Sequence, residues 1–128
     1  MGLLTGEGGT VMVVDDSEDI RELICMSLRC KGYKVLEAAN GEEAVELAER
    51  SHPRLILMDL NMPVMDGYEA TRRIKALPGF YEVPVVAISA FCDPSNSYKA
   101  LEAGCVECLS KPIDSPSFDS LVSRYLQV

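Results

Sequence analysis

Short runs of apolar residues recur along the chain, and turn residues separate them. The most apolar run, residues 55–59, ends in the carboxylate of Asp59, and Pro63 and the Asp66-Gly67 pair follow it. Such punctuation ends a strand and starts a loop. An apolar run of this length predicts a strand that is buried on both faces. Runs of the same kind occupy residues 10–14, 33–38, 55–59, 83–88 and 106–110.

Apolar residues at helical spacing fill the intervals between these runs. Ile20, Leu23, Ile24 and Leu28 would give the first interval one apolar helix face. Capping residues, glycines and prolines mark where such helices begin and end. The predicted helices run from Ser17 to Gly32, from Asn40 to Pro53, through Ala70 to Pro78, over residues 95–103, and from Ser115 onward. Ser95, Asn96 and Ser97 have low helix propensity and predict that the fourth helix is weak.

Strands that alternate with helices predict an α/β fold with a parallel sheet, right-handed crossovers and helices on both faces. The runs at 10–14, 55–59 and 83–88 are nearly all apolar, so these strands should be central. The other two carry polar residues and should lie at the edges: Lys34, Glu37, Glu107 and Ser110. We therefore predict a flavodoxin-like, doubly wound (βα)5 sheet in the order 2-1-3-4-5. Residues 10–128 would form it, after a flexible, glycine-containing lead-in at residues 1–9.

Charged and polar side chains follow the carboxyl ends of the predicted strands. Asp15 and Asp16 follow the first strand, Asp59 ends the third, Ser89 ends the fourth and Lys111 follows the fifth. The carboxyl ends of parallel strands share one edge of the sheet, so these side chains should converge. Carboxylates about 5 Å apart repel each other by about 3 kcal/mol at an effective dielectric near 20. The cluster therefore predicts a cation, and oxygen ligands favour Mg²⁺.

These groups together suit phosphoryl transfer. A carboxylate beside Mg²⁺ can attack a phosphoryl group and form an acyl phosphate. The ammonium of Lys111 and the hydroxyl of Ser89 would offset charge on the phosphoryl oxygens. Taken singly, each residue has an ordinary structural interpretation: acids before Ser17 can simply favour a helix N-terminus, and an isolated lysine usually lies on the surface. Only their convergence at one edge points to a site.

Composition restricts the partners and the location. The 128 residues include 12 Lys+Arg and 20 Asp+Glu, for a net charge of −8. That balance argues against direct binding to nucleic acid or to an anionic membrane. No run of 18 apolar residues predicts a membrane span, and the N-terminus lacks the features of a signal peptide. Five cysteines, an odd number, are interpreted as reduced thiols in a cytoplasmic protein.

From about Val11 to Leu126 the chain resembles the receiver domains of two-component response regulators. The resemblance rests on Asp15-Asp16, on Asp59 with Met62-Pro63 and Asp66-Gly67, on Ser89-Ala90 and on Lys111-Pro112, in this order. It implies that Asp59 accepts a phosphoryl group from a histidine kinase or a His-phosphotransfer protein. It also implies Mg²⁺ held by Asp16, Asp59 and the backbone carbonyl of Asn61, with Asp15 acting through water. Lys111-Pro112 is often a cis bond in this family.

The resemblance further implies a conformational switch rather than a conventional enzyme. Such a domain catalyses its own phosphotransfer, and any hydrolysis of its phosphoryl group would be slow. The signal would pass to a downstream protein through the surface of the fourth helix, the fifth strand and the fifth helix. No DNA-binding segment follows residue 128, so we expect output through a partner or through a larger hybrid protein.

One residue departs from the family pattern. Receiver domains usually carry Tyr or Phe three residues before the lysine, and that aromatic side chain moves inward when the Ser or Thr moves onto the phosphate. This chain has Cys108 there. A thiol cannot fill the same volume, so readout should differ, with Phe91 as a substitute. We interpret Cys108 as a buried thiol, because the Cys105–Cys108 pair does not lie at a helix start as thioredoxin-like pairs do.

Other functional classes fit less well. An Asp-dependent phosphohydrolase has a second acid two residues after the nucleophile, where this chain has Asn61. A flavin-binding module needs a phosphate loop after its first strand, and Asp15-Asp16 would repel phosphate. A receiver-like module that binds a partner independently of phosphorylation stays open because of Cys108.

Overall fold

The computed structural model describes residues 9–62, 65–90, 92–111 and 115–126. The lead-in before Gly9 and the predicted features at Pro63, Phe91 and Pro112 lie outside these residues.

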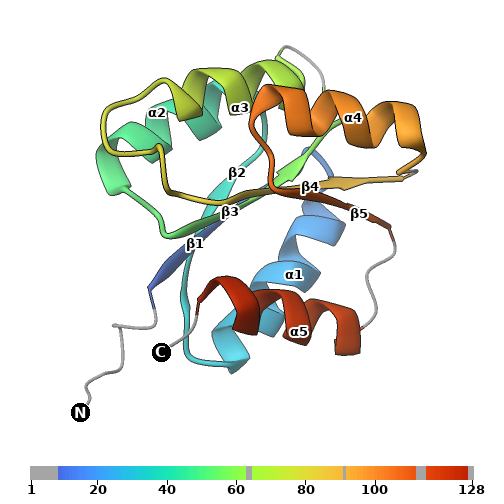
Figure 1. Cartoon of the computed structure of the whole chain (residues 1–128). Coiled ribbons are helices and arrows are strands. Elements are labelled where there is room, and N and C mark those ends of the chain that lie inside the picture. Colours follow the sequence, from blue (N-terminus) through green and yellow to red (C-terminus); the bar gives the residue numbers. More distant parts are fainter. Residues whose placement is uncertain (1–8, 63–64, 91, 112–114, 127–128) are drawn as a thin grey trace.

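Five parallel strands form one sheet in the order β2-β1-β3-β4-β5, as predicted (Figure 1). Each crossover connection contains one helix, which is the arrangement that parallel neighbours require. The register sets Val14 beside Met58 and Asp59 beside Ile88, so that β1, β3 and β4 end near one another. The strands are β1 (Thr10–Val14), β2 (Lys34–Ala38), β3 (Leu55–Asp59), β4 (Val85–Ser89) and β5 (Glu107–Ser110).

Helices cover both faces of the sheet in three layers. In Figure 1, α1 and α5 lie below the sheet, and α2, α3 and α4 lie above it. The helices are α1 (Glu18–Cys30), α2 (Gly41–Ser51), α3 (Gly67–Lys75), α4 (Pro94–Ala103) and α5 (Ser115–Tyr125).

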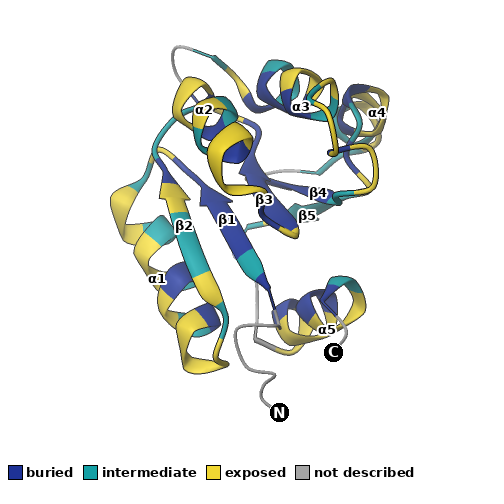
Figure 2. Cartoon of the chain, turned by 90° about the vertical axis from the view of Figure 1, so that its left-hand side faces the viewer, coloured by how far each residue is buried: buried dark blue, intermediate teal, exposed yellow. Residues whose placement is uncertain are grey.

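Each face of the sheet has its own apolar core, because successive side chains of a strand point to opposite faces. On β1, Met12 and Val14 pack into the core below α2, α3 and α4, whereas Val11 and Val13 pack against α1 and α5. All residues of β3 and β4 are buried, while β2 and β5 are more exposed (Figure 2). The central and edge strands are therefore those that polarity predicted.

The helices start at residues that satisfy their free N–H groups. Ser17, Asn40, Asp66 and Asp93 each accept a hydrogen bond from the backbone N–H three residues later. Asp66 thus caps α3, although the sequence pattern had assigned it only to a loop. Asp93 and the following Pro start α4 one residue before the predicted boundary, and offset the weak propensity of its first turn.

The start of β4 differs from its predicted position for a simple backbone reason. β4 begins at Val85 rather than at residue 83, because Pro84 has no N–H to donate to a ladder. Its carbonyl oxygen still accepts from Ile56 N at 3.1 Å, which ties the start of β4 to β3. The sequence therefore predicted every strand, and the errors lie at the ends.

Candidate functional site

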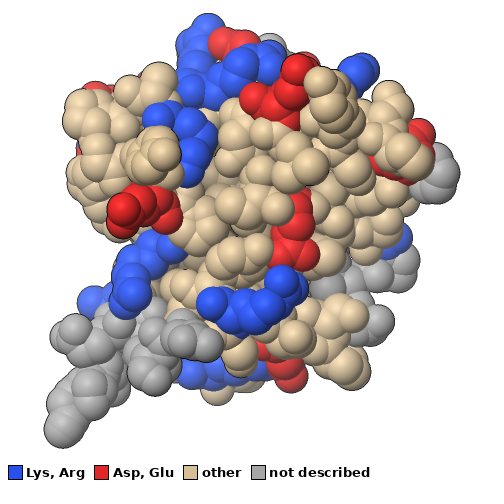
Figure 3. All heavy atoms as spheres, in the orientation of Figure 1, with Lys and Arg blue, Asp and Glu red and all other residues tan. Residues whose placement is uncertain are grey.

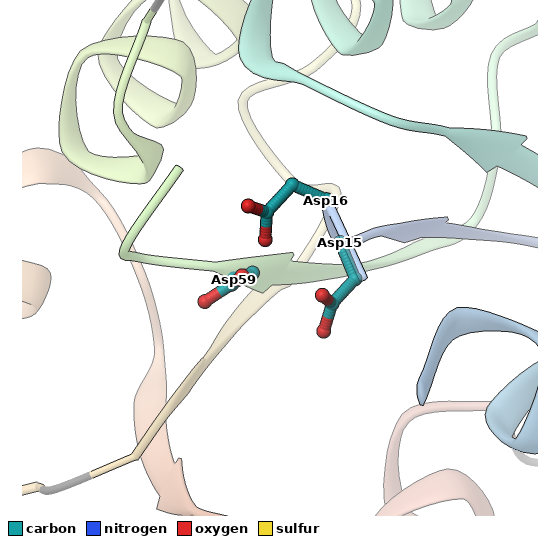
Figure 4. Close-up of side chains that lie close together, drawn as sticks. All are labelled: Asp15, Asp16 and Asp59. Carbon is teal, nitrogen blue, oxygen red and sulfur yellow. The ribbon is translucent and has the colours of Figure 1, made fainter. Parts of the chain in front are cut away.

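Three aspartates meet at the carboxyl end of the sheet. Asp15 and Asp16 directly follow β1, and Asp59 is the last residue of β3, its neighbour in the sheet (Figure 4). One carboxylate oxygen from each lies within 4.8 Å of the others. Asp15 and Asp59 are buried, whereas Asp16 is exposed, so the cluster opens to solvent at Asp16. Carboxylate oxygen atoms are the type of ligand that Mg²⁺ prefers.

Lys111, which directly follows β5, contacts the same cluster of aspartates. Its Nζ lies 3.0 Å from Asp15 Oδ2 and 3.6 Å from Asp59 Oδ1. The ammonium therefore offsets part of the repulsion between two buried carboxylates. Its backbone N–H also donates to Ser89 O at 2.7 Å, which joins the ends of β4 and β5.

The carboxyl group of Asp59 is buried and has a raised pKa. Only 3% of the residue is exposed. Burial raises the pKa of its carboxyl from 3.8 to about 6; the charges of Asp15 and Asp16 act in the same direction. The hydrogen bond that Asn61 N donates to Asp59 Oδ1 at 3.1 Å and the ammonium of Lys111 both lower the pKa and partly oppose the increase. The ionised carboxylate of Asp59 therefore destabilises the fold, and a nearby cation would stabilise it.

Asp15 is held rigidly by backbone and side-chain partners. Its Oδ1 accepts from Ser17 N at 2.9 Å, and its carbonyl oxygen accepts from Arg21 Nη1 at 2.8 Å. Arg21 also donates to Glu37 on β2 at 3.1 Å. Arg21 therefore positions the loop that carries the acids. Sequence reasoning missed this role and predicted only that Arg21 lies on the first helix.

Of the other predicted site residues, Ser89 and Asn61 are in the part of the chain that the structure describes, and Phe91 is outside it. Ser89 is buried at the end of β4. The backbone of Asn61 is adjacent to Asp59, as its hydrogen bond requires, and its side chain is exposed. Phe91 is not among the described residues.

The interpretation of all cysteines as reduced thiols is wrong for two of them. Cys92 and Cys108 form a disulfide, with their Cα atoms 6.2 Å apart, and Cys108 is half-buried rather than a buried thiol. Cys92 lies just beyond the end of β4, and its N–H donates to Ser110 Oγ on β5 at 3.1 Å. The pairing depends on contact between adjacent strands, so an odd cysteine count could not reveal it. Cys25, Cys30 and Cys105 are free.

Comparison with known proteins identifies the family. Residues 11–123 match the response regulator receiver domain. The chain belongs to this family. It is 34% identical over 117 residues to the polar-differentiation response regulator DivK of Brucella ovis, and the match covers 91% of this chain and 95% of DivK.

Solved receiver structures share the fold closely. The chemotaxis protein CheY4 of Vibrio cholerae superposes with a TM-score of 0.87 at 29% identity, covering 91% of this chain and 98% of CheY4. The receiver domain of the sensor histidine kinase PA1611 from Pseudomonas aeruginosa also gives 0.87, at 34% identity, covering 94% of this chain and 99% of that domain. That structure has a magnesium ion coordinated in its active site cleft. The flavodoxin-like receiver fold is thereby confirmed.

As a member of this family, the receiver domain acts in two-component signalling, and it carries an acidic cluster of Asp15, Asp16 and Asp59. In the part of the chain that the structure describes, no helix is long and apolar enough to cross a membrane. The roles of Asp59, Asp16, Ser89 and Lys111 in phosphorylation stay predictions.

Proposed function

We propose that this receiver domain accepts a phosphoryl group on Asp59 from a phosphohistidine donor, with Mg²⁺, and acts as a conformational signalling switch. The observation that carries the proposal is the buried carboxylate of Asp59 beside two further aspartates and the ammonium of Lys111. A carboxylate oxygen of Asp59 would form a bond to phosphorus while the bond from phosphorus to the donor's imidazole nitrogen breaks. The imidazole leaves with the electron pair of that bond.

Three further residues of the site would assist the transfer, each in a different way. Lys111 Nζ, 3.6 Å from Asp59 Oδ1, would neutralise negative charge on the transferred group. Ser89, buried at the neighbouring strand end, would donate its hydroxyl hydrogen to a phosphoryl oxygen. Asp15, fixed by Ser17 and Lys111, would keep the ammonium in position.

The residues present fit a magnesium ion. Asp16 and Asp59 would hold it with the backbone carbonyl of Asn61, and Asp15 would act through water. When bound, the ion would neutralise phosphoryl oxygens and orient the group for in-line transfer. The raised pKa of Asp59, caused first by burial, is consistent with a site that a cation completes.

The chain would catalyse its own phosphorylation and only slow loss of the phosphoryl group. Asn61 stands where a phosphohydrolase has its second acid. An amide cannot act as a general acid or base at this position, so water attack on the acyl phosphate should be slow.

The partners would be a histidine kinase or a His-phosphotransfer protein, and a downstream protein that recognises α4, β5 and α5. Uncharged side chains cover much of the face shown in Figure 3, which has the orientation of Figure 1. Three apolar side chains at this part of the chain are exposed: Tyr98 (63%) and Leu101 (53%) on α4, and Val106 (43%) directly before β5. Exposed apolar side chains of this kind suit protein binding. We propose a cytoplasmic location, with residues 10–128 as the receiver unit.

A second candidate is a module that binds its partner whether or not Asp59 is phosphorylated. It is favoured by Cys108, which occupies the position of the family's switching aromatic residue and is bonded to Cys92. A side chain held by a covalent bond cannot make the inward movement on which the usual switch depends.

Intact-mass analysis separates these candidates. The protein is incubated with a small phosphodonor such as acetyl phosphate, with Mg²⁺ or with a chelator. We expect gain of one acid-labile phosphoryl group that requires Mg²⁺ and is absent in Asp59→Asn, whereas Asp119→Asn, an exposed aspartate on α5, labels normally. Failure to label from small donors and from a panel of His-phosphotransfer proteins would favour the phosphorylation-independent module.

A further inference from the structure

The disulfide between Cys92 and Cys108 encloses one complete helix. The two cysteines are 16 residues apart, and α4 lies between them. Cys92 precedes the cap Asp93, and Cys108 is the second residue of β5. The bond therefore fixes the start of α4 to the strand that follows its end.

The same bond lies next to two strand ends of the phosphoacceptor site. Ser89 ends β4 three residues before Cys92, and Lys111 follows β5 three residues after Cys108. Backbone hydrogen bonds link these segments, from Lys111 N to Ser89 O at 2.7 Å and from Cys92 N to Ser110 Oγ at 3.1 Å. A change at the sulfur atoms would thus act on the segments that carry Ser89 and Lys111.

The cysteines of the chain differ in their accessibility. Cys92 and Cys108 are half-buried, so part of each residue is in contact with solvent, although Cys108 also packs against the core. Cys25 and Cys105 are buried, and desolvation raises the pKa of each thiol, to about 11 for Cys25. Such thiols are poor nucleophiles at neutral pH. Cys30 is exposed on α1, on the opposite face of the sheet from α4 (Figure 1).

We propose that Cys92 and Cys108 form a reversible modification site that exchanges with a small-molecule thiol, such as glutathione, and with its disulfide. In reduction, the thiolate of one small thiol attacks a sulfur of the pair, and the protein S–S bond breaks to give a mixed disulfide and one free cysteine. A second small thiol attacks the mixed disulfide, frees the other cysteine and leaves as the small-molecule disulfide. Two electrons and two protons pass to the protein, and oxidation by the small-molecule disulfide reverses both steps.

Reduction would remove the covalent link between the start of α4 and β5. The start of the helix would then be held by its cap, by its packing and by two hydrogen bonds, from Cys92 N to Ser110 Oγ and from Tyr68 Oη to Asn96 Oδ1. Its opening should become more frequent, because local stability depends on such ties. Any effect of this release on signal output rests on the proposed phosphorylation of Asp59, whereas the exchange itself does not.

Counting thiols tests the exchange directly. Exposed Cys30 can itself form a mixed disulfide with glutathione, so the count is made in the Cys30→Ser variant. After equilibration with oxidised glutathione, alkylation in denaturant should label Cys25 and Cys105, and after reduced glutathione it should label Cys92 and Cys108 as well. Returning the protein to oxidised glutathione should restore the first count. Replacing both Cys92 and Cys108 with Ser should abolish the difference of two labels. Four labelled cysteines under both conditions, or two glutathione adducts in place of the internal bond, would overturn the proposal.

Amide hydrogen exchange tests the structural consequence. Reduction should speed exchange in α4 by about tenfold or more and leave α1 unchanged. The Cys92→Ser variant should show the fast rate under both conditions, whereas equal α4 rates in the oxidised and reduced wild type would overturn the coupling. Phosphorylation of Asp59 is measured in parallel on both forms. If neither the oxidised nor the reduced form is phosphorylated but thiol exchange is normal, the proposed function is contradicted and the proposed exchange site is not.

Discussion

A single buried carboxylate sets the chemistry and part of the energetics of this domain. Asp59 combines 3% exposure with a pKa of about 6, and burial is the first cause of that pKa. Lys111 and the N–H of Asn61 stabilise its ionised form only in part. The buried negative charge of Asp59 therefore destabilises the fold.

Without Mg²⁺, the free energy of unfolding should decrease as the pH rises through about 6. The pKa of Asp59 is higher in the fold than its ordinary value of 3.8, so the native state binds the proton more tightly. That stabilisation is complete below pH 3.8 and is lost as the pH passes about 6. Urea unfolding at about pH 5 and about pH 7.5 should show a loss of about 1–2 kcal/mol in the wild type.

The Asp59→Asn variant should lack this loss and be more stable than the wild type at neutral pH by about 1–3 kcal/mol. The amide keeps an oxygen that can accept from Asn61 N and carries no charge. Asp119→Asn, half-exposed on α5, should keep the wild-type pH dependence. Equal pH dependence in wild type and Asp59→Asn would show that burial of this charge does not limit stability.

Some residues of the site could be predicted from the sequence, whereas the partners of others could not. Asp15, Asp16 and Asp59 were predictable because each follows an apolar run whose end is fixed by the sheet. Cys92 was not, because its partnership with Cys108 arises only when β4 and β5 become neighbours. The role of Arg21 could not be predicted for the same reason, since its two acceptors, Asp15 O and the carboxylate of Glu37, lie in different parts of the chain.

At the scale of elements, α4 depends on its ends more than on its composition. Its first turn is rich in Ser and Asn, but Asp93 accepts from Asn96 N at 2.7 Å and Gly104 closes the helix with a φ of 119°. Propensity alone predicted a weak helix and missed the cap, because capping depends on one side chain's local geometry.

Replacing Asp93 with Ala should destabilise the protein by about 1 kcal/mol and speed amide exchange across α4. The variant loses the side-chain acceptor that Asp93 provides for Asn96 N. Asp93→Asn is the matched control, because its side-chain oxygen can still accept. Unchanged exchange in Asp93→Ala would show that packing, rather than the cap, holds the helix.

The connection from β3 to α3 has no room for a side chain at Gly67. A Cβ there would meet backbone atoms of Asp59 and Leu60, with Leu60 Cα at 2.7 Å. Gly67 N also donates to Leu60 O at 3.1 Å, so the loop cannot simply open. The glycine therefore sets how close α3 approaches the residue that carries the site.

Gly67→Ala should destabilise the fold by about 2 kcal/mol or more and reduce phosphorylation of Asp59. Gly32→Ala provides the comparison: its φ is 91° but the space around its Cβ is open, so only the backbone conformation is penalised, by about 1 kcal/mol. Urea unfolding of both variants measures the difference. A smaller loss at Gly67 than at Gly32 would contradict the close approach described here.

At the scale of the whole molecule, the doubly wound sheet gathers charge at one edge of an already acidic protein. The net charge is −8, and the sheet brings three aspartates within 4.8 Å at the ends of β1 and β3. The order of strands followed from which runs were wholly apolar, so the position of this edge was predictable. The exact ends of the strands were less predictable, because a single hydrogen bond can decide them. Pro84, for example, accepts from Ile56 N but has no N–H to donate.

Mg²⁺ should raise the melting temperature by several degrees. A ligand that binds only the native state at ten times its Kd stabilises it by about 1.4 kcal/mol. Asp16→Asn should lose this response with little change in the metal-free melting temperature, because Asp16 is exposed. Asp119→Asn should respond as the wild type does. Equal responses in wild type and Asp16→Asn would argue against this acid as a metal ligand.

Locating the phosphoryl group is the most direct test of the central claim. After treatment with a phosphodonor and Mg²⁺, borohydride reduction converts an aspartyl phosphate to homoserine, and peptide mass analysis identifies the altered residue. We predict homoserine at position 59, only in samples that received donor and Mg²⁺, with Asp15 and Asp16 unchanged. Conversion at another aspartate, or a stable phosphate on a hydroxyl side chain, would contradict the assignment of Asp59 as the phosphoacceptor.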